Sequence, residues 1–218
     1  MARPSKDRIV AALLERHGRT YAHELGIDLE RDTSSVLFRW LCASLLLSAR
    51  ISADLAMEAA GALAKQGWTT AAKMAEATWE QRTRTLNQAG YARYDESTSR
   101  MLGDTADMLL DKYQDDLRKL RAAAERDPAR ERALLKDCKG IGDVGADIFC
   151  REAQIVWDEL FPFADRRALE TARRLGLEDD AGRLARRVPR NDYARLLAAL
   201  VRTGLAKDVD GVLEAARR

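Results

Sequence analysis

Several features that would anchor or cross-link a protein are scarce in this sequence. Its 218 residues include only three cysteines, Cys42, Cys138 and Cys150, and none stands in a C-x-x-C pair. A disulfide framework is therefore excluded, and the three thiols are expected to pack as small apolar residues. We predict no metal site and no cofactor.

The sequence also lacks a large excess of charge of either sign. Lysine and arginine number 37 against 35 acidic residues, so the net charge of +2 is only a weak argument for nucleic acid. Local basic clusters occur at 166–167, 173–174 and 183–190, and each is either a solvated helix surface or part of a binding face. With 46% hydrophobic and 33% charged residues, the composition is that of an ordinary globular protein.

Long hydrophobic runs are absent. Residues 1–6 lack the apolar core of a signal peptide, and no later segment approaches the length of a membrane span. We therefore expect a cytoplasmic protein that makes no membrane contact.

Helical periodicity is present in nearly every segment, whereas almost none alternates as a strand would. A strongly apolar stretch at 36–48 is expected to be a central helix, and Asp127-Pro128 is a strong helix start. Asn191 is expected to cap the start of a later amphipathic helix, and Gly204 is expected to end it. There is no repeat and no linker rich in proline or serine. The predicted fold class is all-α, and the four tryptophans are expected in its core.

A glycine turn joins two of these helices. One apolar stripe ends at 134–138, another includes 148–149, and Gly140, Ile141 and Gly142 leave room only for a tight hairpin between them. Glycines without Cβ atoms let a rigid surface approach the main chain, and the second helix begins with unpaired N–H groups. That arrangement holds a phosphate backbone without reading base sequence.

The segment Phe161-Pro162-Phe163-Ala164-Asp165 follows about twenty residues later and delivers one carboxylate at a helix start. The hairpin and this aspartate together resemble the helix-hairpin-helix (HhH-GPD) DNA glycosylases. The resemblance implies that Asp165 is the catalytic carboxylate, stabilising positive charge on the sugar and orienting water. The alternative from the residues alone is an ordinary N-cap for the helix that begins at Arg166.

Two further segments are similar to the endonuclease III branch of that family. Residues 45–50 match a Leu-Ser-Ala-Gln segment whose glutamine fills the gap left by a flipped base, and Arg50 stands at the glutamine position. Residues 86–94 match a turn that carries a wedge residue, here Tyr91. The alternatives are a surface arginine and a half-buried tyrosine. In order and spacing the resemblance covers roughly 34–176.

The resemblance implies a two-lobed helical fold with double-stranded DNA bound in a cleft between the lobes. One lobe is 34–150, and the other is 1–33 with 151–218 and carries the catalytic aspartate. The implied partner is duplex DNA with a damaged base, bound by a monomer associated with the nucleoid. The implied DNA-binding residues are Gly140, Ile141, Gly142, Val144, Gly145, Arg50, Tyr91 and Arg166.

Departures from the family pattern narrow the predicted chemistry. Val144 occupies the position of the lysine that forms a Schiff base in bifunctional members, so strand cleavage by that route is excluded. No cysteine follows Cys150, so the iron–sulfur cluster of many relatives is expected to be absent. Asp143 is an unusual neighbour for a phosphate, and an arginine at 166 or 167 is expected to bind phosphate or pair with Asp165.

Three hypotheses follow. The first is a monofunctional DNA glycosylase for a damaged or mispaired base. The second is a protein that has lost catalysis and uses the hairpin to hold bent or damaged DNA. The third is a lyase that uses Lys139, and it predicts a borohydride-trapped adduct that is lost in Lys139→Ala. The sequence does not identify the lesion.

Overall fold

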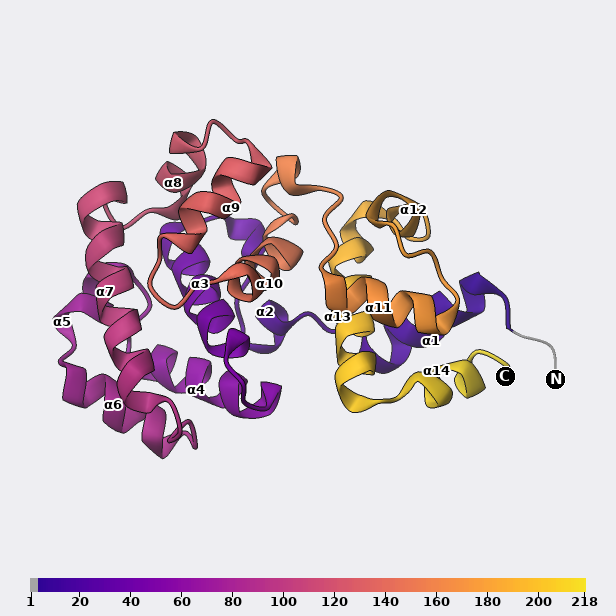
Figure 1. The fold of residues 1–218 in the computed structure, drawn as a ribbon, viewed down its shortest axis with the longest axis horizontal. Coiled ribbons are helices and arrows are strands. Elements are labelled where there is room, and N and C mark those ends of the chain that lie inside the picture. Colours follow the sequence, from indigo (N-terminus) through magenta and orange to yellow (C-terminus); the bar gives the residue numbers. More distant parts are fainter. Residues whose placement is uncertain (1–3) are drawn as a thin grey trace. The chain divides into compact units, whose positions relative to one another are not determined.

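Residues 4–218 are described by a computed structural model, and no β-strand occurs among them (Figure 1). The prediction of an all-α fold is confirmed for this part of the chain. The described residues divide into two compact units. We call 25–150 the hairpin unit and 4–24 with 151–218 the aspartate unit. None of the described helices is long and apolar enough to cross a membrane.

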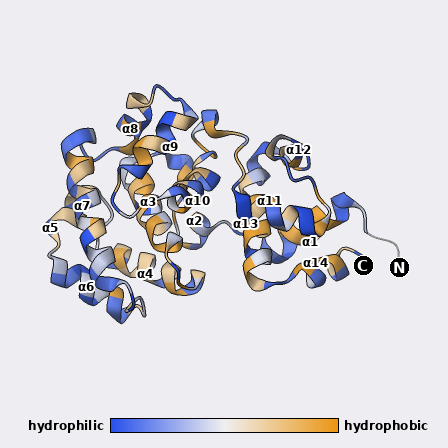
Figure 2. Cartoon of the chain, viewed as in Figure 1, coloured by the Kyte–Doolittle hydropathy of each residue, from blue (hydrophilic) through white to orange (hydrophobic). Residues whose placement is uncertain are grey.

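The hairpin unit is built around one apolar helix. Its elements are η1 (Leu29–Arg31), α3 (Ser34–Ser48), α4 (Ala53–Lys65), α5 (Ala71–Glu76), α6 (Trp79–Gln88), α7 (Asp95–Tyr113), α8 (Leu117–Ala123), α9 (Pro128–Lys136) and most of α10 (Asp143–Ala153). The Thr33 hydroxyl caps α3 by accepting from the Val36 N–H. Leu37 and Trp40 are fully buried on α3, and Figure 2 shows hydrophobic residues recurring along this helix. The expectation of a central apolar helix here is confirmed.

The aspartate unit combines both ends of the described chain. Its elements are α1 (Lys6–His17), α2 (Tyr21–Glu24), η2 (Asp158–Leu160), α11 (Arg166–Leu175), α12 (Ala181–Ala185), α13 (Arg190–Ala206) and α14 (Val209–Ala215). Helix α13 packs on both α1 and α11, and its residues Leu196, Leu197 and Leu200 are completely buried. Burial of this apolar face holds the N-terminal helix against the C-terminal third of the chain.

Two expected helix ends were wrong in α13. The helix begins at Arg190 after Pro189, so Asn191 lies inside its first turn. It continues past Gly204 to Ala206. A Cβ on Gly204 would lie 2.5 Å from the Thr171 hydroxyl oxygen. The glycine therefore permits close packing of α13 on α11 and does not end the helix.

The N-terminal boundary between the units also differs from the expected one. It falls between 24 and 25 rather than between 33 and 34. Arg39 on α3 contributes contacts at this boundary, because its guanidinium donates to the carbonyl oxygens of Leu25 at 2.8 Å and Gly26 at 3.3 Å. These bonds tie 25–33 to the hairpin unit.

Candidate nucleic-acid interface and catalytic carboxylate

The predicted hairpin is present between α9 and α10. The Asp127 carboxylate caps α9 by accepting from the Arg130 N–H at 2.8 Å, with Pro128 in the first turn. Gly140 has φ +86, and the Ile141 N–H donates to the Cys138 carbonyl across the turn. The Ala146 N–H donates to the Gly142 carbonyl at 2.9 Å. The N–H groups of 143–145 therefore precede the α10 ladder, where an anion is favoured.

The turn is anchored on two helices of the hairpin unit. A Cβ on Gly140 would lie 2.8 Å from the Met101 sulfur and 3.1 Å from a Leu45 methyl carbon. The Thr105 hydroxyl donates to the Lys139 carbonyl at 3.0 Å. Leu45 belongs to α3, and Met101 and Thr105 belong to α7. The turn is thus held by packing and needs no ligand to keep its shape.

The hairpin residues differ in what they offer a ligand. Gly142 and Val144 are exposed, whereas the Ile141 side chain is 4% exposed. A Cβ on Gly145 would lie 3.2 Å from Ile141 Cδ1 and 3.6 Å from Ser48 Cβ. The Ile141 side chain therefore packs beneath the turn, and a DNA contact at Ile141 stays a prediction. The Ile141 N–H already donates to the Cys138 carbonyl, so the donors left for a phosphate at this turn are the N–H groups of 143–145.

Two glycine substitutions separate the shape of the turn from its surface. Gly140→Ala is expected to lower the free energy of unfolding by about 1–3 kcal/mol, because alanine is strained at positive φ and its Cβ meets Met101. Gly142→Ala has open space around the added Cβ, so its stability should be unchanged. Its methyl group, however, would stand where a phosphate approaches, and duplex binding should weaken several-fold. Urea denaturation and fluorescence anisotropy test the pair; equal DNA affinity of Gly142→Ala and wild type would contradict phosphate contact at this turn.

Asp143 does not stand alone at the start of α10. Its carboxylate is 3.0 Å from the Lys136 ammonium and 3.4 Å from the Arg132 guanidinium, which also lies 2.7 Å from Asp147. The hydrogen bond from Lys136 lowers the pKa of Asp143. The two cations offset the repulsion that Asp143 would exert on a phosphate.

Arg50 lies in the loop that links α3 to α4. The Ser52 hydroxyl caps α4 at the end of this loop by accepting from the Leu55 N–H. The Arg50 side chain is exposed, and no other residue within 4–218 pairs with its guanidinium. Ser48, just before the loop, lies beside Gly145 of the hairpin. Arg50 is therefore an unoccupied donor on a loop next to the hairpin.

Tyr91 is not a wedge, contrary to the sequence-based expectation. Its side chain is completely buried, and its hydroxyl donates to the Leu46 carbonyl at 3.2 Å. Burial raises the pKa of Tyr91 to about 12. The exposed residues of this turn are Ala92 and Arg93, and the Arg93 guanidinium lies 5.3 Å from the centre of the Tyr94 ring. Tyr91 instead attaches the turn to the end of α3.

Removing the Tyr91 hydroxyl tests this correction. Tyr91→Phe should lower the free energy of unfolding by about 1 kcal/mol, because one buried hydrogen bond to Leu46 is lost. Its affinity for duplex DNA should match that of wild type. Denaturation and anisotropy measured on the same preparation suffice. A large loss of DNA affinity at unchanged stability would restore Tyr91 to the DNA surface.

Asp165 is a buried N-cap that is also held in an ion pair. One oxygen, Oδ1, accepts from the Arg167 and Ala168 N–H groups at 2.9 and 3.1 Å. The other, Oδ2, accepts from Arg151 Nη1 at 2.9 Å, with the two side chains only 5% and 3% exposed. The Gln154 amide holds the approach to Asp165 by accepting from the Phe163 N–H and donating to its carbonyl. The carboxylate is thus fixed in position by three donors.

Arg151 was not identified from the sequence, which pointed to arginine 166 or 167 as the partner of Asp165. In the structure Arg166 is exposed and pairs with Glu170 at 2.7 Å. Burial opposes the charge of Arg151, but the Asp165 and Glu152 carboxylates outweigh it and hold its pKa above the ordinary value. Two adjacent charged residues, Arg151 and Glu152, directly after the apolar run 148–150 were the signal available in the sequence. Their partners depend on the tertiary fold.

The Arg151–Asp165 pair belongs to a wider buried network. Both Glu152 oxygens accept backbone N–H groups at 2.9 Å, from Tyr21 and Ala22 at the start of α2. The Arg151 guanidinium carbon lies 5.6 Å from the centre of the Tyr21 ring. Burial of Glu152 raises its pKa, although Arg151 and the two N–H groups oppose that shift. The network fixes α2 and the end of α10 around the carboxylate of Asp165.

The cysteines do not fit an iron–sulfur cluster. Such a cluster needs four thiolates, and the sequence contains only three cysteines. All three thiols are buried, and burial raises the pKa of Cys138 and Cys150 to about 12. Among residues 4–218 no group of histidine, cysteine and acidic side chains is arranged to hold a metal ion.

Comparison with solved structures gives a distant structural likeness. No protein-family model and no curated protein matches the sequence. The chain is similar to the solved structure of a trapped endonuclease III–DNA covalent intermediate, an estranged-adenine complex. The identity is 17% over 75% of this chain and 71% of that chain, with a TM-score of 0.48.

Proposed function

We propose that this protein binds duplex DNA and acts as a monofunctional DNA glycosylase. The observation that carries the proposal is that three segments meet the same end of α3. The glycine turn contacts Leu45, the Tyr91 hydroxyl bonds to Leu46, and the start of α10 lies beside Ser48. Trp40 strengthens this assembly by donating to the Phe149 carbonyl of α10 at 3.1 Å. An anion-binding hairpin is thereby combined with the loop that carries Arg50.

The proposed chemistry is hydrolysis of the N-glycosidic bond. As that bond breaks, the base departs with the bonding electrons and the sugar becomes positively charged. The Asp165 carboxylate stabilises that charge, water adds to the sugar carbon, and the proton that the water loses passes to the departing base. Val144, 46% exposed at the start of α10, provides no amine for a Schiff base. The product on this route is an abasic site in an uncut strand.

A second candidate function is DNA binding without excision. It is favoured by the state of Asp165, whose two oxygens already accept three hydrogen bonds and whose side chain is 5% exposed. A carboxylate so engaged serves the aspartate unit as an N-cap and ion-pair partner. In this case the hairpin and Arg50 hold bent or damaged DNA, and the chain catalyses nothing.

Binding and excision are tested in one experiment. Duplexes carrying uracil, an oxidised pyrimidine, an alkylated purine or a mismatch are titrated with the protein and then treated with hot alkali to reveal abasic sites. Binding together with alkali-dependent cleavage supports the glycosylase. Binding without cleavage on any duplex favours the second function. If the protein binds none of the duplexes, both functions are refuted. Cleavage without alkali points to a lyase such as one using Lys139.

A further inference from the structure

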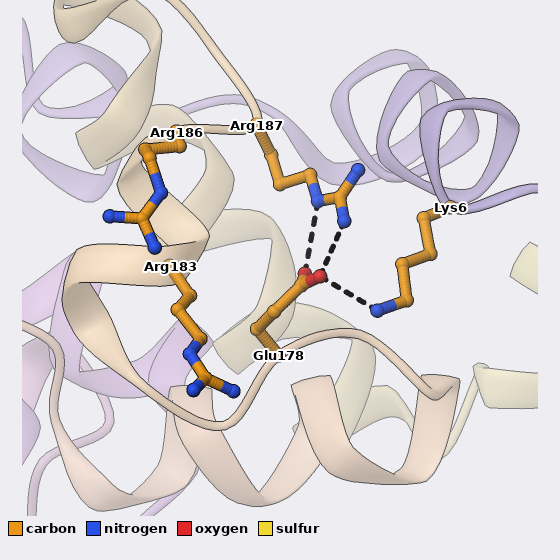
Figure 3. Close-up of a pocket in the computed structure, with 5 residues that line it drawn as sticks. All are labelled: Lys6, Glu178, Arg183, Arg186 and Arg187. Carbon is orange, nitrogen blue, oxygen red and sulfur yellow. Dashed lines mark hydrogen bonds and ion pairs between the residues drawn. The ribbon is translucent and has the colours of Figure 1, made fainter.

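The aspartate unit contains a basic concavity far in sequence from the hairpin. It measures about 340 Å³ and is lined by Lys6, Glu178, Arg183, Arg186 and Arg187. Lys6 begins α1, whereas the other residues come from α12 and the segments on either side of it. Figure 3 shows Lys6 and Arg187 directed toward the Glu178 carboxylate. We call these five residues the basic concavity.

Glu178 organises part of the basic concavity. Its carboxylate accepts from both Nε and Nη2 of Arg187, and from the Lys6 ammonium at 2.7 Å. Hydrogen bonds from Arg187 are the main reason that the pKa of Glu178 falls to about 2. The carboxylate is therefore charged at neutral pH, and it positions Lys6 and Arg187 while neutralising part of their charge.

Arg183 and Arg186 are not neutralised in this way. Both side chains are exposed, and neither guanidinium has a carboxylate partner within the described chain. Asp180 lies close in sequence, but one of its oxygens accepts from the Arg183 backbone N–H at 2.8 Å to cap α12. Asp7, next to Lys6 on α1, pairs with Arg187 at 3.3 Å. Positive charge remains in excess, concentrated on two free guanidinium groups.

We propose that the basic concavity binds a phosphate group of the nucleic-acid backbone, with Arg183 and Arg186 as its donors. Each guanidinium presents a planar fork of N–H donors that matches two phosphate oxygens. The five lining residues are all charged and none is aromatic, so the contact is with the backbone and carries no sequence information. This inference rests on the proposed DNA binding and adds a second phosphate contact to it. A free phosphate compound presents the same phosphate oxygens and is the alternative ligand.

The test is the salt dependence of duplex binding by the full chain. In Arg183→Gln/Arg186→Gln, the Glu178–Arg187–Lys6 contacts stay intact, so folding is preserved. The slope of log K against log salt should become less steep by about 1–2, with a several-fold weaker affinity at low salt. Arg217→Gln/Arg218→Gln in the same unit removes the same charge outside the basic concavity and should leave the slope unchanged. Circular dichroism verifies that both variants fold.

The outcomes distinguish this site from the proposed function itself. If wild type binds DNA and the Arg183→Gln/Arg186→Gln variant keeps its slope, the site is overturned while DNA binding stands. An equal loss in both double variants also overturns it, because general charge then explains the effect. If wild type binds no DNA, calorimetric titration with inorganic pyrophosphate tests whether the basic concavity binds phosphate at all. Binding lost in the Arg183→Gln/Arg186→Gln variant supports a phosphate site fed by a free compound, and no binding refutes it.

Discussion

Arg151→Met is expected to lower the free energy of unfolding of the aspartate unit by about 3–5 kcal/mol, because it leaves the buried Asp165 carboxylate without its cation. Methionine retains much of the volume of the arginine stem, so the loss reports charge rather than an empty space. The Arg167 and Ala168 N–H groups still bond to Asp165, and they limit the damage. Urea denaturation followed by circular dichroism measures the loss. Hydrogen exchange of the peptide 161–175 locates it in this unit.

The matched control is a double-mutant cycle. Asp165→Asn alone leaves a buried guanidinium, and within residues 4–218 the Arg151 Nε already has no hydrogen-bond partner. Arg151→Met/Asp165→Asn removes both charges and should be more stable than the sum of the single losses predicts, by about 1–3 kcal/mol. Additive single losses would mean that the two side chains stabilise the unit independently.

The structural features that the sequence predicts correctly are those determined by residues adjacent in the chain. Asp127-Pro128 predicted the start of α9, and Gly140 is at the positive φ of the predicted turn. The residues around Asp165 also fit an N-cap for the helix after it, and Asp165 does cap α11. Each of these features depends on a few adjacent residues, whose conformational preferences do not require knowledge of the rest of the fold.

The parts that were not predictable depend on contacts distant in sequence. Tyr91 is buried because it packs at the end of α3, where its hydroxyl donates a hydrogen bond to the carbonyl of Leu46. The two residues are 45 positions apart in the sequence. Arg151 reaches Asp165 because the end of α10 packs against the loop before α11. Neither contact leaves a periodic pattern in one sequence. The two predictions that failed at the candidate site therefore concern tertiary packing, which the local motifs do not determine.

The geometry of Asp165 suits one catalytic task better than another. Its carboxylate is held in place by hydrogen bonds from Arg151 and from two backbone N–H groups. A carboxylate whose two oxygens are already engaged in this way is poorly placed to take a proton from water. It is well suited to stabilising positive charge that develops on a sugar, because it needs no reorganisation as the bond breaks. In the proposed glycosylase, Asp165 therefore acts mainly through its charge.

Asp165→Asn is accordingly expected to lower the single-turnover rate of base excision by about 10²–10³. Asparagine keeps the shape of the side chain and one oxygen that can cap α11, so the variant removes the charge with little change of shape. Arg151→Met is the control, since it breaks the same ion pair but leaves the carboxylate in place. It should keep most of the excision activity under conditions where both variants are folded. Equal losses in the two variants would show that the pair only maintains the fold, and full activity of Asp165→Asn would remove Asp165 from the chemistry altogether. If only Asp165→Asn loses excision activity, the charge of the Asp165 carboxylate explains the loss. Both variants lack the ion pair, but only Asp165→Asn lacks the carboxylate charge.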